Sequence, residues 1–400
     1  MNILFLSIGS LNNIENKGIY TDLMRQFRDN GHQVYIVSPR ERRLKKPTEY
    51  RKENGVHLLK VKIGNIRQNN LIEKGIATLM IEGQFLRAIK KHFEDITFDL
   101  VIYSTPPITF EKVIRYIKKR DKAKSYLLLK DIFPQNAIDL NMFSKNSIIY
   151  KFFRLKESRL YNISDFIGCM SQANIDYLHK QNPQISGGYL EICPNSINPT
   201  PIEKDVNQIA RTREKYNVPN DRIVFIYGGN LGKPQGINFL IDCLHANKSN
   251  QHVFFIIVGS GTEFNKVKAY FDKEQPTNAL LLKELSQKDY EELVNSCDVG
   301  LIFLDHRFTI PNFPSRLLSY MQSSMPVLAA TDSNTDIGHV MKQGGFGLWC
   351  ESNNIEQFNK NLQQLYYSKV RREMGRNARA YLEQNYTSKH SYDIIMNHFK

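Results

Sequence analysis

The stretch from Pro311 to Asp332 joins a loop, a cation and a predicted helix. It reads PNFPSRLLSYMQSSMPVLAATD, in which a loop rich in Pro and Asn precedes an amphipathic helical pattern and Met-Pro leads into an apolar strand. The first turn of a helix offers unpaired backbone N–H groups and a partial positive charge, which suit a phosphate group. Arg316, in that first turn, adds a fixed cation. We therefore expect this stretch to bind an anion.

Two glycine loops directly follow predicted strands in the same half of the chain. The first reads GGNLGKPQG from Gly228, and the second reads GSGT from Gly259. Glycine permits close approach of the backbone to a phosphate, and Lys233 in the first loop supplies a point charge. The second loop lacks the GxGxxG spacing of a dinucleotide site. Taken alone, each loop is also explained by a tight strand–helix turn. All three segments would share one sheet edge, which favours a nucleotide diphosphate.

Asp131 is the acidic residue with the clearest chemical potential. It ends the apolar run Leu127–Leu129, and Pro134 follows three residues later. Two interpretations stay open. The carboxylate could orient or deprotonate an acceptor, or it could cap the strand–helix turn as an Asx-type turn residue.

Apolar runs alternate with helical patterns along the whole chain. The rhythm restarts after a linker at 194–201, which holds three prolines in eight residues. We therefore predict an α/β protein with two doubly wound, Rossmann-like domains facing a central cleft, at 1–196 and 197–380. A C-terminal helix at about 381–400 is expected to pack back on the first domain. Strands are predicted at 3–8, 34–37, 100–103, 125–129, 166–170 and 189–192, then at 223–227, 253–258, 279–282, 299–303 and 327–330.

Composition indicates the compartment of the protein and whether it binds a metal. The 400 residues contain five cysteines with no CxxC pair, which indicates neither a disulfide framework nor a structural zinc site and favours a reducing cytoplasm. The N-terminus lacks the features of a signal peptide, and no apolar stretch approaches the roughly 20 residues that span a bilayer. No Asp-x-Asp occurs, and no histidines have metal-ligand spacing, so we expect no metal or other cofactor.

Positive charge is concentrated in the first half. Lys and Arg exceed Asp and Glu by 12 over residues 1–200 and by 2 over 201–400. Nucleic acid, an anionic membrane and a simply solvated surface all fit this asymmetry. No nucleic-acid-binding motif accompanies the charge, so we expect no nucleic acid partner. Aromatic residues interleaved with lysines at 140–160 suit a membrane surface, although each could instead belong to the core. We predict peripheral membrane association through residues 40–160.

Several of these segments occur in the order typical of one enzyme family. They are Lys130-Asp131-Ile132-Phe133-Pro134, Cys193-Pro194-Asn195, the two glycine loops, Asn295–Val299 and FPSRLLSYM. Over nearly its whole length the chain resembles the family 4 retaining glycosyltransferases of the GT-B fold, and in particular bacterial enzymes of capsule and O-antigen synthesis. The resemblance implies a nucleotide-sugar donor, with UDP favoured, and a polyprenyl-diphosphate-linked sugar acceptor. It also implies a location on the cytoplasmic face of the cell membrane.

The resemblance assigns roles to single residues. Asn230 and Gln235 stand where the family usually carries an Arg and a Lys, while Pro311 and Ser319 stand where it carries a Glu-x7-Glu pair. Arg316 and Lys233 are then left to hold the donor diphosphate. Asp131 is the catalytic candidate, and Lys17 and Gly18 form an acceptor-diphosphate loop. The donor-binding set implied is Gly229, Asn230, Lys233, Gly259, Gly261, Leu285, Asn312, Phe313, Pro314, Ser315, Arg316 and Ser319.

Two other functions share this architecture. A nucleotide-sugar 2-epimerase would need carboxylates and histidines in the cleft, which the sequence does not locate. A non-catalytic partner subunit would explain the loss of the Glu pair. The sequence leaves the sugar, the base, the acceptor and the oligomeric state open.

Overall fold

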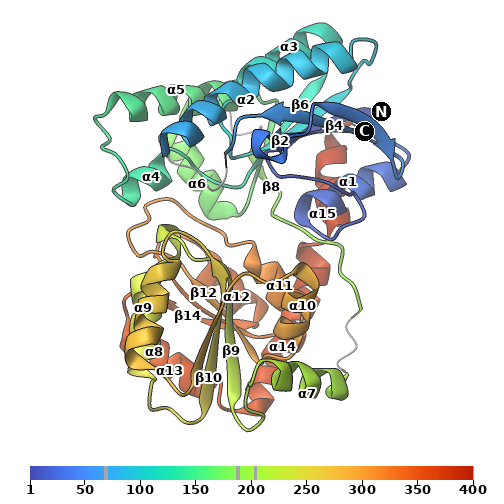
Figure 1. The fold of residues 1–400 in the computed structure, drawn as a ribbon. Coiled ribbons are helices and arrows are strands. Elements are labelled where there is room, and N and C mark those ends of the chain that lie inside the picture. The colour runs from blue at the N-terminus through green and yellow to red at the C-terminus, as the bar shows by residue number, and fades with distance from the viewer. Residues whose placement is uncertain (67–70, 186–189, 202–204, 400) are drawn as a thin grey trace. The chain divides into compact units, whose positions relative to one another are not determined.

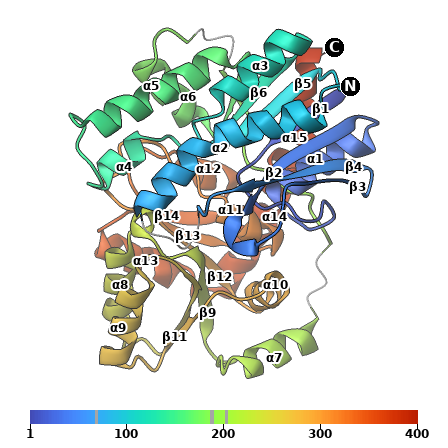
Figure 2. The ribbon, with the colours of Figure 1, turned by 45° about the horizontal axis from the view of Figure 1, so that its top comes forward.

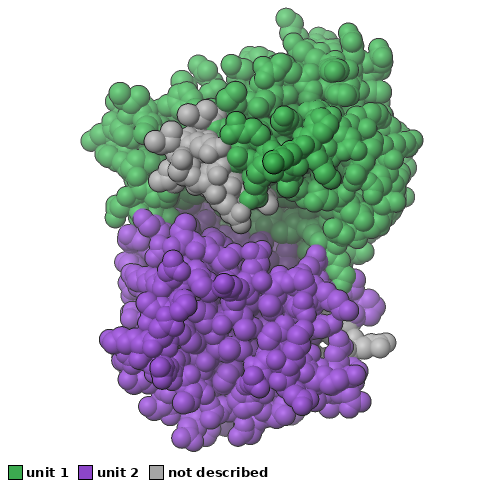
Figure 3. Space-filling view, in the orientation of Figure 1, with its two compact units in different colours: residues 1–198, 387–400 green, residues 199–386 purple. Residues whose placement is uncertain are grey.

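The chain divides into two compact units. The computed structural model describes residues 1–66, 71–185, 190–201 and 205–399, with side chains described throughout these ranges except at 71–76. Unit 1 comprises Met1–Asn198 with Thr387–Lys400, and unit 2 comprises Pro199–Tyr386 (Figures 1 and 3). The boundary falls after Asn198, inside the proline-rich linker. The return to unit 1 at Thr387 lies six residues beyond the expected position of about 381.

Unit 1 is built on an eight-stranded sheet with the order β3-β4-β2-β1-β5-β6-β7-β8. All neighbouring strands run parallel except β3 and β4, which are antiparallel. Continuous apolar runs such as Ile3–Leu6 are buried on both faces, as expected for a parallel sheet covered by helices. The strands are β1 (Asn2–Leu6), β2 (Gln33–Glu41), β3 (Glu49–Glu53), β4 (Val56–Ile63), β5 (Leu100–Ser104), β6 (Lys124–Leu129), β7 (Phe166–Cys169) and β8 (Leu190–Ile192).

Helices cover the sheet of unit 1. α1 packs with the C-terminal α15, and both contribute to an apolar core with β1 and β2. α2, α3 and α5 lie side by side (Figures 1 and 2). The helices are α1 (Ile19–Asp29), α2 (Leu71–His92), α3 (Glu111–Asp121), α4 (Gln135–Asp139), α5 (Ile148–Ile163), α6 (Gln172–Gln181) and α15 (Ser388–Met396), with short 3-10 turns η1 (Arg42–Leu44) and η4 (Asn397–Phe399).

The β3–β4 hairpin was not predicted from the sequence. Its turn is Asn54-Gly55, and both residues have positive φ, at 50° and 76°. Asn-Gly between two strands is a strong hairpin signal because both central residues tolerate that conformation. The turn was therefore readable, but β3 consists of polar residues, Glu-Tyr-Arg-Lys-Glu, and has no apolar run.

Unit 2 has a six-stranded, all-parallel sheet with the order β11-β10-β9-β12-β13-β14. The five predicted strands are confirmed, and β14 was missed because its sequence, Gly-Leu-Trp-Cys-Glu, is too short and mixed to stand out. The strands are β9 (Ile223–Asn230), β10 (Val253–Ser260), β11 (Ala279–Leu282), β12 (Val299–Phe303), β13 (Val327–Thr331) and β14 (Gly347–Glu351).

Helices flank this second sheet on two sides. α8, α9 and α13 bury their apolar faces in one core against β9 and β10, while α10, α11 and α14 lie on the other side (Figure 1). The helices are α7 (Val206–Lys215), α8 (Ile237–Ala246), α9 (Phe264–Glu274), α10 (Gln287–Asn295), α11 (Arg316–Gln322), α12 (Ile337–Gly344), α13 (Ile355–Gln364) and α14 (Ser368–Asn385), with the 3-10 turn η3 (Lys233–Gln235).

The five cysteines are buried and unpaired. None of the helices among the described residues combines the length and apolar character needed to cross a bilayer.

Candidate functional site

The two glycine loops of unit 2 lie side by side. β9 and β10 stay paired to their ends, so that Gly229 is opposite Gly259 and Asn230 is opposite Ser260. Gly259 has φ +154°, and a Cβ atom there would overlap the Gly229 carbonyl oxygen. Only glycine allows this approach. The loops therefore form one continuous stretch of backbone at the carboxyl edge of the sheet, where ligands of open parallel sheets bind.

Arg316 lies against this pair of loops. It begins α11, and its guanidinium carbon lies 4.2 Å from the centroid of the Tyr227 ring, in a cation–π contact. A Cβ atom built on Gly229 would be 3.3 Å from Arg316 Nη2. The Nη1 atom of Arg316 is buried and has no hydrogen-bond partner among the described residues. A permanently charged donor is thus left unsatisfied beside the glycine loops, as an anion site requires.

Three tyrosines hold the Arg316 guanidinium in place. Tyr227 stacks on it and donates a hydrogen bond to Asn230 O at 2.7 Å. Tyr320 Oη lies 3.1 Å from the carbonyl oxygens of Ile226 and Leu301. Burial raises the pKa of Tyr290 to about 12, although the Arg316 charge acts to lower it. Burial also raises the pKa of Tyr227 and Tyr320, so all three phenols are neutral at physiological pH and form a polar cage around the cation.

Our sequence reasoning missed these tyrosines. Tyr320 is on the same helix as Arg316, four residues on, and Tyr227 directly precedes the first glycine loop, so both had a local signal. Tyr290 comes from α10 and had none. It reaches the loop because Gly228 has no side chain, since a Cβ atom there would overlap the Tyr290 ring and hydroxyl.

Asn230 and Gln235 bind each other across the first loop. Asn230 Nδ2 donates to Gln235 Oε1 at 3.0 Å, and Gly232 N donates to the same oxygen at 3.2 Å. These two positions were expected to have lost cations, and the structure shows that an amide pair closes the loop instead. Lys233, between them, is exposed and forms no ion pair within the described part of the chain. Lys233 is therefore free to meet an anion.

The second loop is tied to the turn before α10. Ser260 Oγ donates to Glu284 Oε2 at 2.9 Å. Leu285 is half-buried between Glu284 and Ser286, the residue that caps α10. The structure thus ties the Gly259–Gly261 loop to the turn that contains Leu285, and the donor-binding role of these residues stays a prediction.

Some of the N–H groups expected to be free at the start of α11 already have partners. The helix has only seven residues, and Leu317 N and Leu318 N donate to Pro314 O and Ser315 O at 3.2 and 3.1 Å. Ser315 has helical φ and ψ, and its side chain makes no capping hydrogen bond. These first-turn bonds use the N–H groups of Leu317 and Leu318, so the Arg316 side chain is the stronger anion-binding feature of this segment.

Other members of this segment have structural partners. Asn312 O accepts a hydrogen bond from Thr335 Oγ1 at 2.6 Å, and Phe313 packs edge-on against Tyr386. Ser319 is half-buried beside Tyr290. Asn312 and Phe313 therefore shape the loop, and Ser319 lines the Arg316 environment.

In unit 1, Asp131 ends up at the carboxyl edge of its sheet. It lies two residues after β6, and Thr105 Oγ1 accepts hydrogen bonds from Lys130 N and Asp131 N at 3.0 and 3.2 Å. The Asp131 carboxylate caps no turn, because α4 begins only at Gln135 and Pro134 occupies its N-cap. The Asx-cap interpretation is therefore wrong, and the role in acceptor chemistry stays a prediction.

The surroundings of Asp131 favour its neutral form. The residue is exposed, yet crowding by protein atoms removes enough water to raise the pKa of its carboxyl to about 6. Tyr20 lies near enough for the carboxylate to disfavour its ionisation, although burial is the main reason that the pKa of Tyr20 rises to about 12. Next to it, Lys130 Nζ donates to Cys193 O at 3.1 Å, and desolvation lowers the pKa of that amine to about 8.

The Lys17–Gly18 loop does not offer the anion site we expected. Gly18 N donates to Asp22 Oδ1 at 3.0 Å, and the other oxygen of Asp22 accepts from Asn198 N at 2.7 Å. Asp22 is buried, and Arg25 pairs with it. The protein thus places its own carboxylate at the start of α1, where the helix dipole favours negative charge. The Gly18 amide is therefore already occupied, and Lys17 is exposed.

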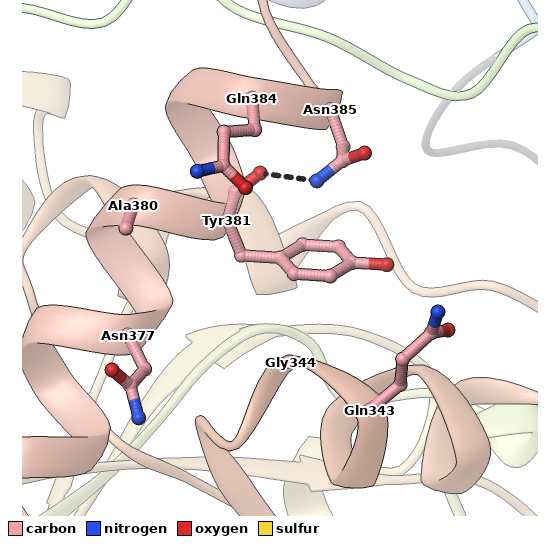
Figure 4. A pocket seen from close by; sticks show the side chains of 7 residues that line it. All are labelled: Gln343, Gly344, Asn377, Ala380, Tyr381, Gln384 and Asn385. Atoms are coloured by element: carbon pink, nitrogen blue, oxygen red, sulfur yellow. Dashed lines mark hydrogen bonds between the residues drawn. The ribbon is translucent and has the colours of Figure 1, made fainter.

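A separate pocket of about 440 Å³ lies between α12 and α14 (Figure 4). It is lined by amide side chains such as Gln343, Asn377 and Gln384, and Asn385 Nδ2 donates to Tyr381 O at 3.1 Å. It contains none of the predicted donor-binding residues. Among the described residues there is also no group of three or more His, Cys, Asp or Glu that could hold a metal ion.

Comparison with known proteins identifies a related family and related folds. Residues 208–381 match the family described as "Glycosyl transferases group 1". A probable glycosyltransferase, WbjE of Pseudomonas aeruginosa, is 24% identical over 289 residues, which cover 72% of this chain and 70% of that protein. Sucrose-phosphate synthase from Thermosynechococcus elongatus has a TM-score of 0.76 at 13% identity, covering 100% of this chain and 98% of that chain. Anabaena HepE, in complex with UDP and glucose, has a TM-score of 0.68 at 15% identity, covering 100% of this chain and 99% of that chain.

The matched region holds both glycine loops and Arg316. The likeness to the solved structures spans both units and concerns the fold. Unit 2 therefore contains the region that is similar to the glycosyl transferases group 1 family, in a chain with the GT-B fold.

Proposed function

We propose that this protein is a glycosyltransferase that moves a sugar from a UDP-sugar to a polyprenyl-diphosphate-linked sugar in the synthesis of a bacterial surface polysaccharide. The observation that carries the proposal is Arg316, a caged cation whose Nη1 atom lacks a partner beside two paired glycine loops. This combination suits the diphosphate of a nucleotide-sugar. The group 1 match over 208–381 and the UDP complex of HepE support the same assignment.

Charge on the departing nucleotide is met by side chains in this proposal. Arg316 supplies a fixed, preoriented charge, and the exposed Lys233 adds a mobile one. Preorganised donors of this kind stabilise charge that develops in the transition state without a reorganisation cost. We infer that the reaction needs no metal ion, because these two cations take the role that a metal would play on the diphosphate.

The stereochemistry that we infer is retention. Pro311 and Ser319 replace the family's carboxylates, so unit 2 lacks the acidic pair of those positions. The bond from the anomeric carbon to the phosphate oxygen breaks while the acceptor oxygen bonds the same face, and the leaving phosphate takes the acceptor proton. Asp131 would orient the acceptor hydroxyl or, in place of the phosphate, accept its proton.

A nucleotide panel tests this function. Calorimetric titration with UDP, GDP and dTDP should show binding that favours UDP, and the Arg316→Ala variant should lose it. Incubation with a UDP-sugar and a polyprenyl-diphosphate sugar should then extend the lipid by one sugar, as seen by mass spectrometry. Nucleotide binding with a changed donor sugar and no extended lipid would identify an epimerase. Absence of nucleotide binding would leave a non-catalytic partner subunit.

A further inference from the structure

Exposed apolar side chains gather on one part of unit 1. Among the described residues thirteen large apolar side chains are exposed, and only two of these, Val206 and Tyr367, lie in unit 2. Seven lie on α2 or on the segment from the end of α4 into α5. They are Leu79, Met80, Met142, Ile148, Ile149, Phe152 and Leu155. Scattered exposed apolar residues need no explanation, but a cluster on a few neighbouring elements marks an interaction site.

On α5 these residues form a single stripe. Ile148, Ile149, Phe152 and Leu155 follow helical spacing, and Ile148 is 85% exposed. The opposite face is buried against the unit, through Glu157, Leu160 and Tyr161. The solvent-facing side of α5 therefore has an apolar stripe, where a surface helix normally has polar residues.

Positive charge accompanies this stripe. Residues 141–160 contain five Lys and Arg residues against one acidic residue, Glu157. Glu157 is buried and accepts hydrogen bonds from Arg154 and Tyr161, so no carboxylate of this segment faces solvent. Lys145, Lys151 and Arg159 are exposed and form no ion pair within the described ranges. We call Met142, Ile148, Ile149, Phe152 and Leu155 with these three cations the α5 patch.

Part of the other basic charge of unit 1 is neutralised within the protein. Arg40 pairs with Glu49, and Arg43 pairs with Glu41. On α3, Arg115, Lys118 and Arg120 all have acidic partners. Internal ion pairs reduce the attraction that these cations exert on an anionic surface. The α5 patch differs from these clusters because it joins cations without an ion pair to an exposed apolar stripe.

We propose that the α5 patch docks on an anionic lipid bilayer, with α5 lying in the plane of the membrane surface. An amphipathic helix binds there by burying its apolar stripe at the acyl boundary while its cations meet anionic headgroups. Both features of the patch are then used. A second copy of the chain is disfavoured as the occupant, because a symmetric contact would bring the three cations of one patch against those of the other.

Flotation of the full-length protein with vesicles tests this docking. Vesicles of phosphatidylcholine with phosphatidylglycerol should carry the protein upward at low salt, and pure phosphatidylcholine vesicles should carry much less. The double variant Ile148→Glu/Phe152→Glu should lose more than tenfold in vesicle binding. Lys145→Gln and Lys151→Gln should each cost about fivefold, the equivalent of roughly 1 kcal/mol per cation. The matched control is Val206→Glu, a change at an exposed apolar side chain of unit 2 that should bind as the wild type does.

Two results would overturn the proposal. One is wild-type protein that stays at the bottom of the gradient with anionic vesicles at low salt. The other is a double variant that floats normally but changes from dimer to monomer in light scattering, which would make the α5 patch a protein interface. All substituted side chains are exposed, so the variants should melt at the wild-type temperature. Neither nucleotide nor acceptor is present in the assay, so its outcome is independent of the proposed transferase activity.

Discussion

Both units place glycine residues before a helix, but they differ in whether the protein itself supplies a negative charge there. In unit 1 the glycine before α1 donates to the Asp22 carboxylate, which the chain itself supplies. In unit 2 the glycine loops lie beside Arg316, whose Nη1 atom has no partner in the described part of the chain. A glycine loop before a helix is thus no sufficient sign of a phosphate site. The glycine loops of the two units differ in whether a charged group of the protein already has a partner there.

This difference assigns separate tasks to the units. Unit 2 keeps an unsatisfied cation for a diphosphate, while unit 1 presents Asp131 and an exposed apolar, basic helix. The predictions below test that separation.

The largest effect is expected from Asp131→Asn. If Asp131 acts on the acceptor, turnover should fall by about 10²-fold or more, while UDP affinity stays unchanged. In the wild type, kcat should rise with pH through about 6, since the pKa of Asp131 is raised to about 6 and only the ionised form is a base. Steady-state kinetics measured across this pH range checks the rise in kcat, which should be absent from the variant. Near-wild-type turnover in the variant would remove Asp131 from the chemistry.

The same pKa has a consequence for stability. A carboxyl whose pKa is raised on folding stabilises the protein fully below its ordinary value of 3.8. That contribution is lost as the pH rises from about 4 through about 6. Asp131→Asn should therefore melt slightly above the wild type at pH 7 and not at pH 4, by scanning calorimetry.

Gly259→Ala should damage unit 2 and its ligand site together. The new Cβ atom would overlap the Gly229 carbonyl oxygen, and both loops would have to separate. We expect UDP binding to be lost and the melting temperature to fall. A matched change is Gly83→Ala on α2, which meets nothing closer than 4.0 Å and should stabilise a helix interior by about 0.5–1 kcal/mol. Normal UDP affinity in Gly259→Ala would show that the paired loops are not the site.

Arg316→Ala should weaken UDP binding by about 10- to 150-fold, which corresponds to the roughly 1.5–3 kcal/mol of a charged hydrogen bond. Ser319→Ala, on the same helix, should cost less than about tenfold because it removes a neutral partner. Isothermal titration measures both affinities. Small and equal effects would mean that the nucleotide binds elsewhere in the protein.

The smallest functional effect is expected from Asp22→Asn. Loss of the carboxylate leaves Gly18 N, Asn198 N and Arg25 with a weaker partner. Urea denaturation should show a loss of about 1–3 kcal/mol in unfolding free energy, with UDP affinity unchanged. A gain or loss of nucleotide binding would contradict the separation of the two units.

Much of the fold followed from local pattern. Apolar runs such as Val253–Val258 predicted the buried parallel strands, because a strand covered on both faces must be apolar throughout. Glycines at strand ends predicted the loops, and the position of Arg316 after Pro314 predicted a cation beside them. The polar β3 strand and the short β14 strand were missed because they lack an apolar run, although Asn54-Gly55 indicated the hairpin.

The state of each charge depended on contacts between distant segments. Tyr290 lies beside Arg316 from another helix, and Asn198 N donates to Asp22 from the linker. Glu157 is buried, so the exposed charged side chains of α5 are all cations. Sequence determined which residues stand at the sheet edges, since strand ends and turns are encoded by neighbours along the chain. Only the tertiary structure decided which of them are already satisfied, because hydrogen bonds and ion pairs form between segments that folding brings together.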